Sequence, residues 1–214
     1  MTARILLTGF DPFDGDTINP SAEIVRALQG ALVAGHTIVG AQLPCEFGRS
    51  RSVLDKALTR WQPVIVLALG QAGGRPDLSL ERVAINVDDA RIADNAGASP
   101  IDEPIVADGP AAHFSTLPIK AMVAALHAAG IPASVSQSAG TFVCNHVFYG
   151  LQHRLAGSGA RSGFMHVPLT PEQALRQPGL LAMPLRTMID GVRIALLAAV
   201  ANRRDLSLAG GSIA

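Results

Sequence analysis

Short runs of mostly apolar residues recur along the chain, and segments with apolar residues at helical spacing separate them. The strand-like runs cover residues 4–9, 36–42, 64–70 and 162–168. The helical segments cover 20–28, 52–61, 117–126 and 184–203. A strand that is apolar at nearly every position is buried on both faces, which is typical of parallel sheets covered by helices. This alternation predicts a single α/β domain with a largely parallel, twisted sheet.

Length and composition fit one large domain with a substantial core, because 49% of the 214 residues are hydrophobic and only 16% are charged. We expect residues 1–205 to form this domain and residues 206–214 to form a flexible C-terminal tail. The 17 basic and 17 acidic side chains cancel. The sequence therefore lacks the positive charge with which proteins bind nucleic acid or an anionic membrane.

The sequence also indicates where the protein works. The apolar run at the N-terminus is too short for a signal peptide, and the run 194–200 is far too short to span a bilayer. Two cysteines, Cys45 and Cys144, do not make a disulfide framework. We expect a cytoplasmic protein with free thiols.

Cys144 is the first candidate for chemistry. It follows a strand-like run at 131–136 and a turn of small residues, and the spacing of apolar residues predicts a helix over 145–155. A thiol in the first turn of a helix feels the positive end of the helix dipole, which lowers the thiol pKa. Free N–H groups at the same place can stabilise an oxyanion. The sequence indicates a nucleophile, while the alternative is a small buried hydrophobic residue.

His166 ends the strand-like run 162–168 and lies 22 residues after Cys144. That interval fits one helix, one turn and one returning strand of a βαβ unit. We therefore expect both residues at the carboxyl edge of neighbouring parallel strands, where α/β sheets hold ligands. His146 is closer in sequence but is turned by about 200° on the same helix, so it faces away. We interpret Cys144 and His166 as a nucleophile and its base.

Such a pair needs a third group that orients the imidazole. Glu81 is our candidate, because it lies at the edge of the glycine-rich loop 71–75. That loop matches neither common nucleotide-binding motif, so no nucleotide cofactor is predicted. The alternative for Glu81 is a surface carboxylate paired with Arg75 or Arg82.

The polar segment 88–110 raises the question of a metal. It contains several acids: Asp88, Asp89, Asp94, Asp102, Glu103 and Asp108. Their spacing matches no calcium loop, and no His/Cys ligand pattern accompanies them. We favour a solvated loop and predict neither a metal nor another cofactor.

Taken together, these segments resemble pyrrolidone carboxyl peptidase, also called pyroglutamyl peptidase type I, a family of cysteine peptidases. The matching blocks span nearly the whole chain in family order: 9–13 with 19–21, 81–86, 94–97, 117–118, 138–145 and 164–168. The resemblance implies a three-layer α/β/α sandwich, a cytoplasmic homo-oligomer that is often a tetramer, and removal of N-terminal pyroglutamate from peptides. It also places Glu81, Cys144 and His166 on the catalytic triad, and it associates Arg91 with the oxyanion site.

Pyroglutamate is a neutral five-membered lactam, so its pocket needs flat apolar walls and a few polar partners. Phe10, Phe13 and Phe142 are our candidates for the walls, although the first two could instead fold back onto the core. Asn19 and Gln71 are our candidates for the polar partners.

Two positions and two alternative functions complete the prediction. Asp14 stands where the family usually has glycine, which could alter loop geometry or ligand affinity. Cys45 is interpreted as a bystander in a turn after Pro44. The alternative functions are a metal- or phosphate-dependent hydrolase that uses the acidic segment 88–108, and a small-ligand binding protein without catalysis.

Overall fold

The fold was obtained as a computed structural model that describes residues 3–177 and 179–211. Within these residues, the central sheet has seven strands in the order β2-β3-β1-β4-β9-β5-β8. Their bounds are β1 (Arg4–Phe10), β2 (Leu32–Val33), β3 (His36–Leu43), β4 (Ile65–Gln71), β5 (Leu78–Glu81), β8 (Ala133–Ser136) and β9 (Arg161–Val167). The four strands β3, β1, β4 and β9 are parallel to one another. A separate antiparallel hairpin contains β6 (Val83–Ile85) and β7 (Ala112–Phe114).

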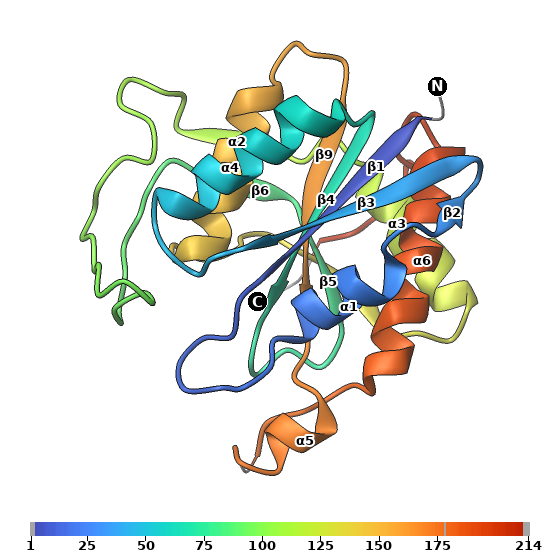
Figure 1. Cartoon of the computed structure of the whole chain (residues 1–214). Helices are drawn as coiled ribbons and strands as arrows, with labels where there is room; N and C mark the ends of the chain where they lie inside the picture. The colour runs from blue at the N-terminus through green and yellow to red at the C-terminus, as the bar shows by residue number, and fades with distance from the viewer. Residues whose placement is uncertain (1–2, 178, 212–214) are drawn as a thin grey trace.

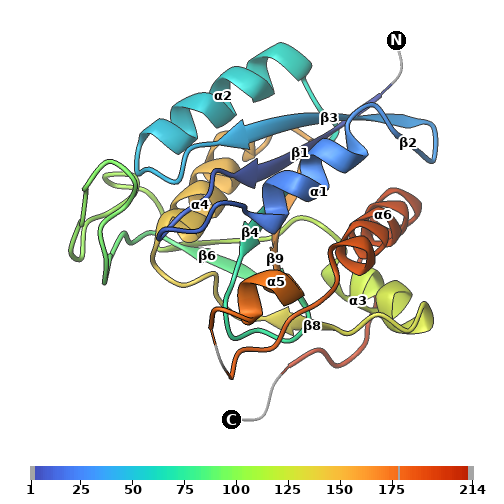
Figure 2. The ribbon, with the colours of Figure 1, turned by 60° about the horizontal axis from the view of Figure 1, so that its bottom comes forward.

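Helices cover both faces of the sheet, so the predicted three-layer α/β/α sandwich is confirmed (Figures 1 and 2). One face carries α1 (Pro20–Leu28), α3 (Ile119–Ala128) and α6 (Leu185–Ala201). The other face carries α2 (Arg49–Trp61) and α4 (Val143–Leu155). The short helix α5 (Pro171–Ala174) lies apart from both layers, at the bottom of Figure 1.

Helix ends follow signals that are visible in the sequence. Asn19 caps α1 by accepting a hydrogen bond from the Ser21 amide, and Pro20 occupies the first turn. Thr170 and Gln173 form the capping box predicted for α5. Helix α4 begins at Val143, so Cys144 lies in its first turn, as predicted.

One part of the predicted topology is wrong. The strand before α4 is β8, and we expected it to be the parallel neighbour of β9. Instead, β5 lies between the two strands, antiparallel to β9 and parallel to β8. The loop 72–77 that joins β4 to β5 is too short to cross back to the start of a parallel strand, so β5 must reverse direction. Strands β8 and β9 and the helix α4 between them therefore do not form a simple βαβ unit, because the two strands are not neighbours in the sheet.

The C-terminal segment contacts the domain. The Arg82 guanidinium donates a hydrogen bond of 2.7 Å to the carbonyl of Gly210. Leu208 and Gly210 share a hollow with Val123 of α3 and Val135 of β8. The remainder of the predicted tail, residues 212–214, lies outside the described residues. No helix in the described ranges is long and apolar enough to cross a bilayer.

Candidate active site

The sulfur of Cys144 lies against the carboxyl end of β4, at a place where that strand has no side chain. A Cβ on Gly70 would stand 2.8 Å from Cys144 Sγ and 2.7 Å from Cζ of Phe164. Gly70 is also the register partner of His166 in the neighbouring strand β9. The missing side chain of Gly70 therefore lets the start of α4 bring the thiol down beside the strand that carries His166.

Glu81 and His166 point to the same face of the sheet as Cys144. On β9, Met165 packs into the core beneath α1, α3 and α6, so its neighbour His166 points to the α2 and α4 side. Glu81 follows the same alternation, because Leu80 packs beneath α1, α3 and α6. The His166 Nδ1–H donates a hydrogen bond of 2.7 Å to Glu81 Oε1. The other ring nitrogen, Nε2, is not used by Glu81 and is therefore available to interact with the Cys144 thiol.

Arg75 also binds this carboxylate. Its Nη1 donates a hydrogen bond of 2.7 Å to Glu81 Oε1, and its Nη2 donates one of 3.2 Å to the carbonyl of Ser138. The alternative of a surface carboxylate is wrong, because Glu81 is fully buried. Pairing with Arg75 is nevertheless present, whereas Arg82 binds the C-terminal segment instead.

Burial decides the protonation states at the site. It raises the pKa of the Cys144 thiol, helped by the nearby Cys45 thiol and by the charge of Glu81, and opposed by the charge of Arg75. The expected lowering of this pKa by the helix is therefore wrong. Burial also lowers the pKa of His166 despite its hydrogen bond to Glu81. The resting pair is a neutral thiol beside a neutral imidazole.

Glu81 stays ionised. Burial favours its neutral form, but the hydrogen bond and charge of His166 and the charge of Arg75 outweigh burial and lower the pKa of Glu81. A carboxylate in this place holds the imidazole with Nδ1 protonated and stabilises positive charge on the ring.

Every predicted site residue other than Glu81 and His166 lines one cavity of about 350 Å³. Those residues are Phe10, Phe13, Asn19, Gln71, Arg91, Phe142 and Cys144. The rings of Phe13 and Phe142 pack with centroids 5.2 Å apart. Phe10 is 2% exposed and contributes to the core as well as to the cavity, so both predicted roles of the loop aromatics are present. The exposed Arg91 borders the same space.

The two polar candidates already have partners within the protein. The amide oxygen of Asn19 accepts from the backbone N–H and hydroxyl of Ser21. The Gln71 amide contacts Asp16, and its oxygen accepts a hydrogen bond of 3.0 Å from Gln173. Both side chains border the cavity, but their hydrogen bonds also hold its walls together. The roles of Asp16 and Gln173 were not predicted, since only the capping box at residue 173 was visible in the sequence.

The acidic segment forms a hydrogen-bond network of its own. The ring of His146 faces Asp88, with 2.7 Å between Nδ1 and the carboxylate, and its Nε2 accepts from the Gly48 amide. Asp94 accepts hydrogen bonds from the amides of Phe47, Ala96 and Ala98. His146 therefore points away from Cys144, as predicted. Asp88 and Asp94 are buried, so the expected solvated loop is wrong at these two positions.

No group of three or more potential metal-ligating side chains lies together in the described residues. Cys45 borders the same cavity as Cys144. Burial, together with the charges of Asp94, Asp11 and Glu46, raises the pKa of the Cys45 thiol to about 12. A thiol with this pKa remains protonated at neutral pH.

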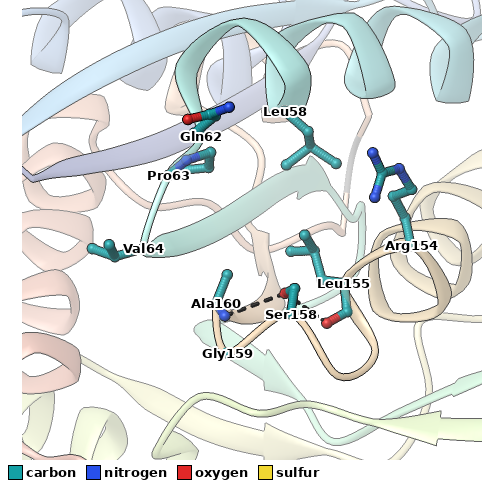
Figure 3. A pocket seen from close by; sticks show the side chains of 9 residues that line it. All are labelled: Leu58, Gln62, Pro63, Val64, Arg154, Leu155, Ser158, Gly159 and Ala160. Carbon is teal, nitrogen blue, oxygen red and sulfur yellow. Dashed lines mark hydrogen bonds between the residues drawn. The ribbon is translucent and has the colours of Figure 1, made fainter.

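A second hollow, of about 460 Å³, opens at the amino end of β4 (Figure 3). The polar side chains around it are Gln62, Arg154 and Ser158. The Ser158 hydroxyl donates to the carbonyl of Leu155 and accepts from the amide of Ala160, so its own loop satisfies it. None of the predicted site residues borders this hollow, which is therefore not our candidate site.

Known proteins similar to this chain share nearly its entire length. The sequence model of the family described as pyroglutamyl peptidase matches residues 3–202. A pyrrolidone-carboxylate peptidase of Cupriavidus taiwanensis is 58% identical over 212 residues, which cover 98% of each chain. One from Erwinia tasmaniensis is 57% identical over 209 residues, with the same coverage. The chain belongs to the pyroglutamyl peptidase family. It is accordingly a hydrolase of the peptidase class.

Solved structures agree with this assignment. The crystal structure of pyroglutamyl peptidase I from Bacillus amyloliquefaciens superposes with a TM-score of 0.92 at 46% identity, covering 95% of this chain and 100% of that one. A mutant pyrrolidone carboxyl peptidase from Pyrococcus furiosus gives a TM-score of 0.90 at 41% identity, with 92% and 98% coverage. The resemblance to the pyroglutamyl peptidase family and the predicted fold class are both confirmed.

Proposed function

We propose that this peptidase removes N-terminal pyroglutamate from peptides, with Cys144 as nucleophile, His166 as general acid and base, and Glu81 as the group that orients the imidazole. The observation that carries the proposal is the buried 2.7 Å hydrogen bond between His166 and Glu81, on the sheet face and at the sheet edge where Cys144 packs. A buried carboxylate that fixes an imidazole next to a thiol is the arrangement that nucleophilic acyl transfer needs.

Acylation begins from the neutral pair. The Cys144 proton passes to Nε2 of His166 as the sulfur attacks the pyroglutamyl carbonyl carbon, and Glu81 stabilises the imidazolium that forms. The bond to the next residue then breaks, and His166 returns the proton to the leaving amine. The product on the enzyme is a thioester with Cys144. Water activated by His166 hydrolyses this thioester and releases free pyroglutamate.

The oxyanion would lie at the start of α4. The first N–H groups of a helix have no partner inside it, so those around Cys144 can donate to the carbonyl oxygen of the substrate. Arg91 borders the cavity and would add positive charge. Both contributions act where negative charge develops in the transition state.

The cavity fits a small neutral ring. Phe13 and Phe142 supply flat apolar walls against which a five-membered lactam can lie. Backbone groups, together with the remaining hydrogen-bonding capacity of Asn19 and Gln71, would bind the lactam N–H and C=O. Such a site would reject an N-terminal proline, which lacks the ring carbonyl, by up to about 10⁴-fold.

The setting of the enzyme is also part of the proposal. A peptidase that depends on a free thiol works best in a reducing compartment, so we place it in the cytoplasm. We expect a homo-oligomer, a tetramer by family resemblance, which light scattering of the purified protein would test. We expect residues 1–205 to fold as one unit.

The direct test is release of a fluorescent amine from its pyroglutamyl derivative. Wild type should release it, Cys144→Ala should lose at least about 10³-fold in kcat, and Cys45→Ala should retain turnover with at most a changed KM. A chelator should leave the wild-type rate unchanged. Activity that survives in Cys144→Ala and disappears in Cys45→Ala would reverse the assignment of the nucleophile. Loss of activity with the chelator would favour a metal-dependent hydrolase.

A further inference from the structure

The carboxylate of Glu81 is oriented through only one of its oxygens. Oε1 accepts hydrogen bonds from both His166 and Arg75, each of 2.7 Å. Within the described residues, no hydrogen bond of good geometry reaches the buried Oε2. The nearby hydroxyl of Ser136 helps to lower the pKa of Glu81, but it donates to the carbonyl of Ser138. A carboxylate held through one oxygen depends on both of its donors for its position. Without one donor, the hydrogen bond to the remaining donor would let the Glu81 carboxylate rotate.

Arg75 also contacts the segment that leads to the nucleophile. Its second guanidinium nitrogen donates to the carbonyl of Ser138, in the turn between β8 and α4 that leads to Cys144. One planar group therefore joins the Glu81 end of β5 to the loop that delivers the thiol. Because the guanidinium fork is rigid, it fixes the distance between these two parts of the site.

We infer that Arg75 is a positioning residue of the peptidase, which holds Glu81 against His166 and anchors the turn before Cys144. This inference rests on the proposed function of the site. Arg75 does not border the substrate cavity, so it should act on catalysis through Glu81 and leave substrate binding nearly unchanged.

The charge of Arg75 acts in the same direction on both reacting groups. The charged groups that face both His166 and Cys144 are Glu81 and Arg75, and the protonated Cys45 thiol also lies near Cys144. Arg75 lowers the pKa of His166 in the same direction as burial, and it lowers the pKa of Cys144 against the larger effect of burial. Asp14, Asp16 and Arg91 border the cavity beyond the thiol. Removing the cation should raise both pKa values together.

The test compares Arg75→Gln, Arg75→Lys and Arg82→Gln with wild type, using the pH profile of kcat/KM for a pyroglutamyl amide. Arg75→Gln should lower kcat about 10- to 100-fold, the size usual for partners that orient a reacting group, with KM nearly unchanged. Both limbs of its profile should move up by about one pH unit. Arg75→Lys should keep the wild-type limbs, because the charge remains, but recover only part of kcat, because an ammonium lacks the fork.

Arg82→Gln is the matched control, since Arg82 neighbours Glu81 in sequence but binds Gly210 instead. It should leave both limbs in place. A loss of kcat in Arg75→Gln with unmoved limbs, or a change confined to KM, would overturn the inference. Thermal unfolding of each variant identifies any loss of activity that comes from misfolding. If Arg75→Gln does not fold, the comparison is made between Arg75→Lys and wild type.

A second readout does not depend on turnover. The rate at which iodoacetamide alkylates Cys144, followed by mass spectrometry against pH in a Cys45→Ala background, should also move to higher pH in Arg75→Gln. If wild type releases no amine while this alkylation profile moves, the proposed function fails and the inference about Arg75 stands. If wild type is active and neither profile moves, the inference alone fails.

Discussion

Asp14 adopts a left-handed backbone conformation, with a φ of 54°, at the rim of the cavity. Residues with a Cβ are disfavoured there by about 1–2 kcal/mol, and aspartate is one of the few that tolerate it. Asp14 thus adopts a conformation that suits the glycine expected here from the family resemblance. The difference that remains is a negative charge beside the candidate pocket.

Replacement of Asp14 can separate the backbone effect from the charge effect. Asp14→Gly should raise the free energy of unfolding by up to about 1 kcal/mol, measured by urea denaturation. Asp14→Asn keeps a residue that tolerates this conformation, so it should leave stability nearly unchanged and report only the effect of the charge on KM. Asp14→Ala should destabilise the fold. A fold that is equally stable with alanine and with glycine would show that the loop can relax.

At the scale of elements, the site depends on how closely α4 approaches β4. Cys144, Phe164 and the backbone of Gly70 meet without room for one more methyl group. Interiors packed to this density resist added volume, and the structure must shift to admit it.

Gly70→Ala should therefore displace the thiol from His166. We expect a loss of at least about tenfold in kcat/KM and a destabilisation of about 1–3 kcal/mol, measured by amide hydrolysis and by chemical denaturation. Gly210→Ala is a suitable control, because its added Cβ would meet atoms no closer than 3.5 Å and Gly210 does not border the cavity. Normal activity in Gly70→Ala would mean that the approach of α4 to β4 is not needed for catalysis.

At the scale of the whole molecule, the end of the chain stabilises an element from its middle. Helix α3 begins after Pro118 without a side-chain cap of its own. The carboxylate of Asp205 accepts hydrogen bonds from the amides of Lys120 and Ala121, at 3.0 Å each. An acid at a helix N-terminus also interacts favourably with the helix dipole. Asp205 thus ties the end of the chain to α3.

Asp205→Ala should lower the free energy of unfolding by about 1 kcal/mol, the usual value of a helix cap. Calorimetry should show a decrease in Tm of about 2–4 °C, given the size of the chain. Activity at 25 °C should be retained, because residue 205 is remote from the cavity. An unchanged Tm would mean that water replaces the carboxylate at no net cost.

Local signals in the sequence were enough for most elements and for the chemistry of the site. Continuous apolar runs predicted β1 and β4, Asn19 with Pro20 predicted the start of α1, and small residues before Cys144 predicted a helix start there. These features depend on neighbours within a few residues, where propensity, capping and apolar spacing act. The pairing of Cys144 with His166 stays a prediction, and the strand order from which it was inferred is wrong.

Only the tertiary structure decided how distant segments meet. It inserted β9 between β4 and β5, which brings His166 beside Gly70 and within reach of Glu81. It also surrounded the half-buried thiol with protein, so that desolvation raises the thiol pKa. Strand order and burial depend on how all apolar faces of a chain are covered at once. The sequence by itself therefore determined the residue types, the elements and the family resemblance, whereas long-range packing determined their contacts and electrostatics.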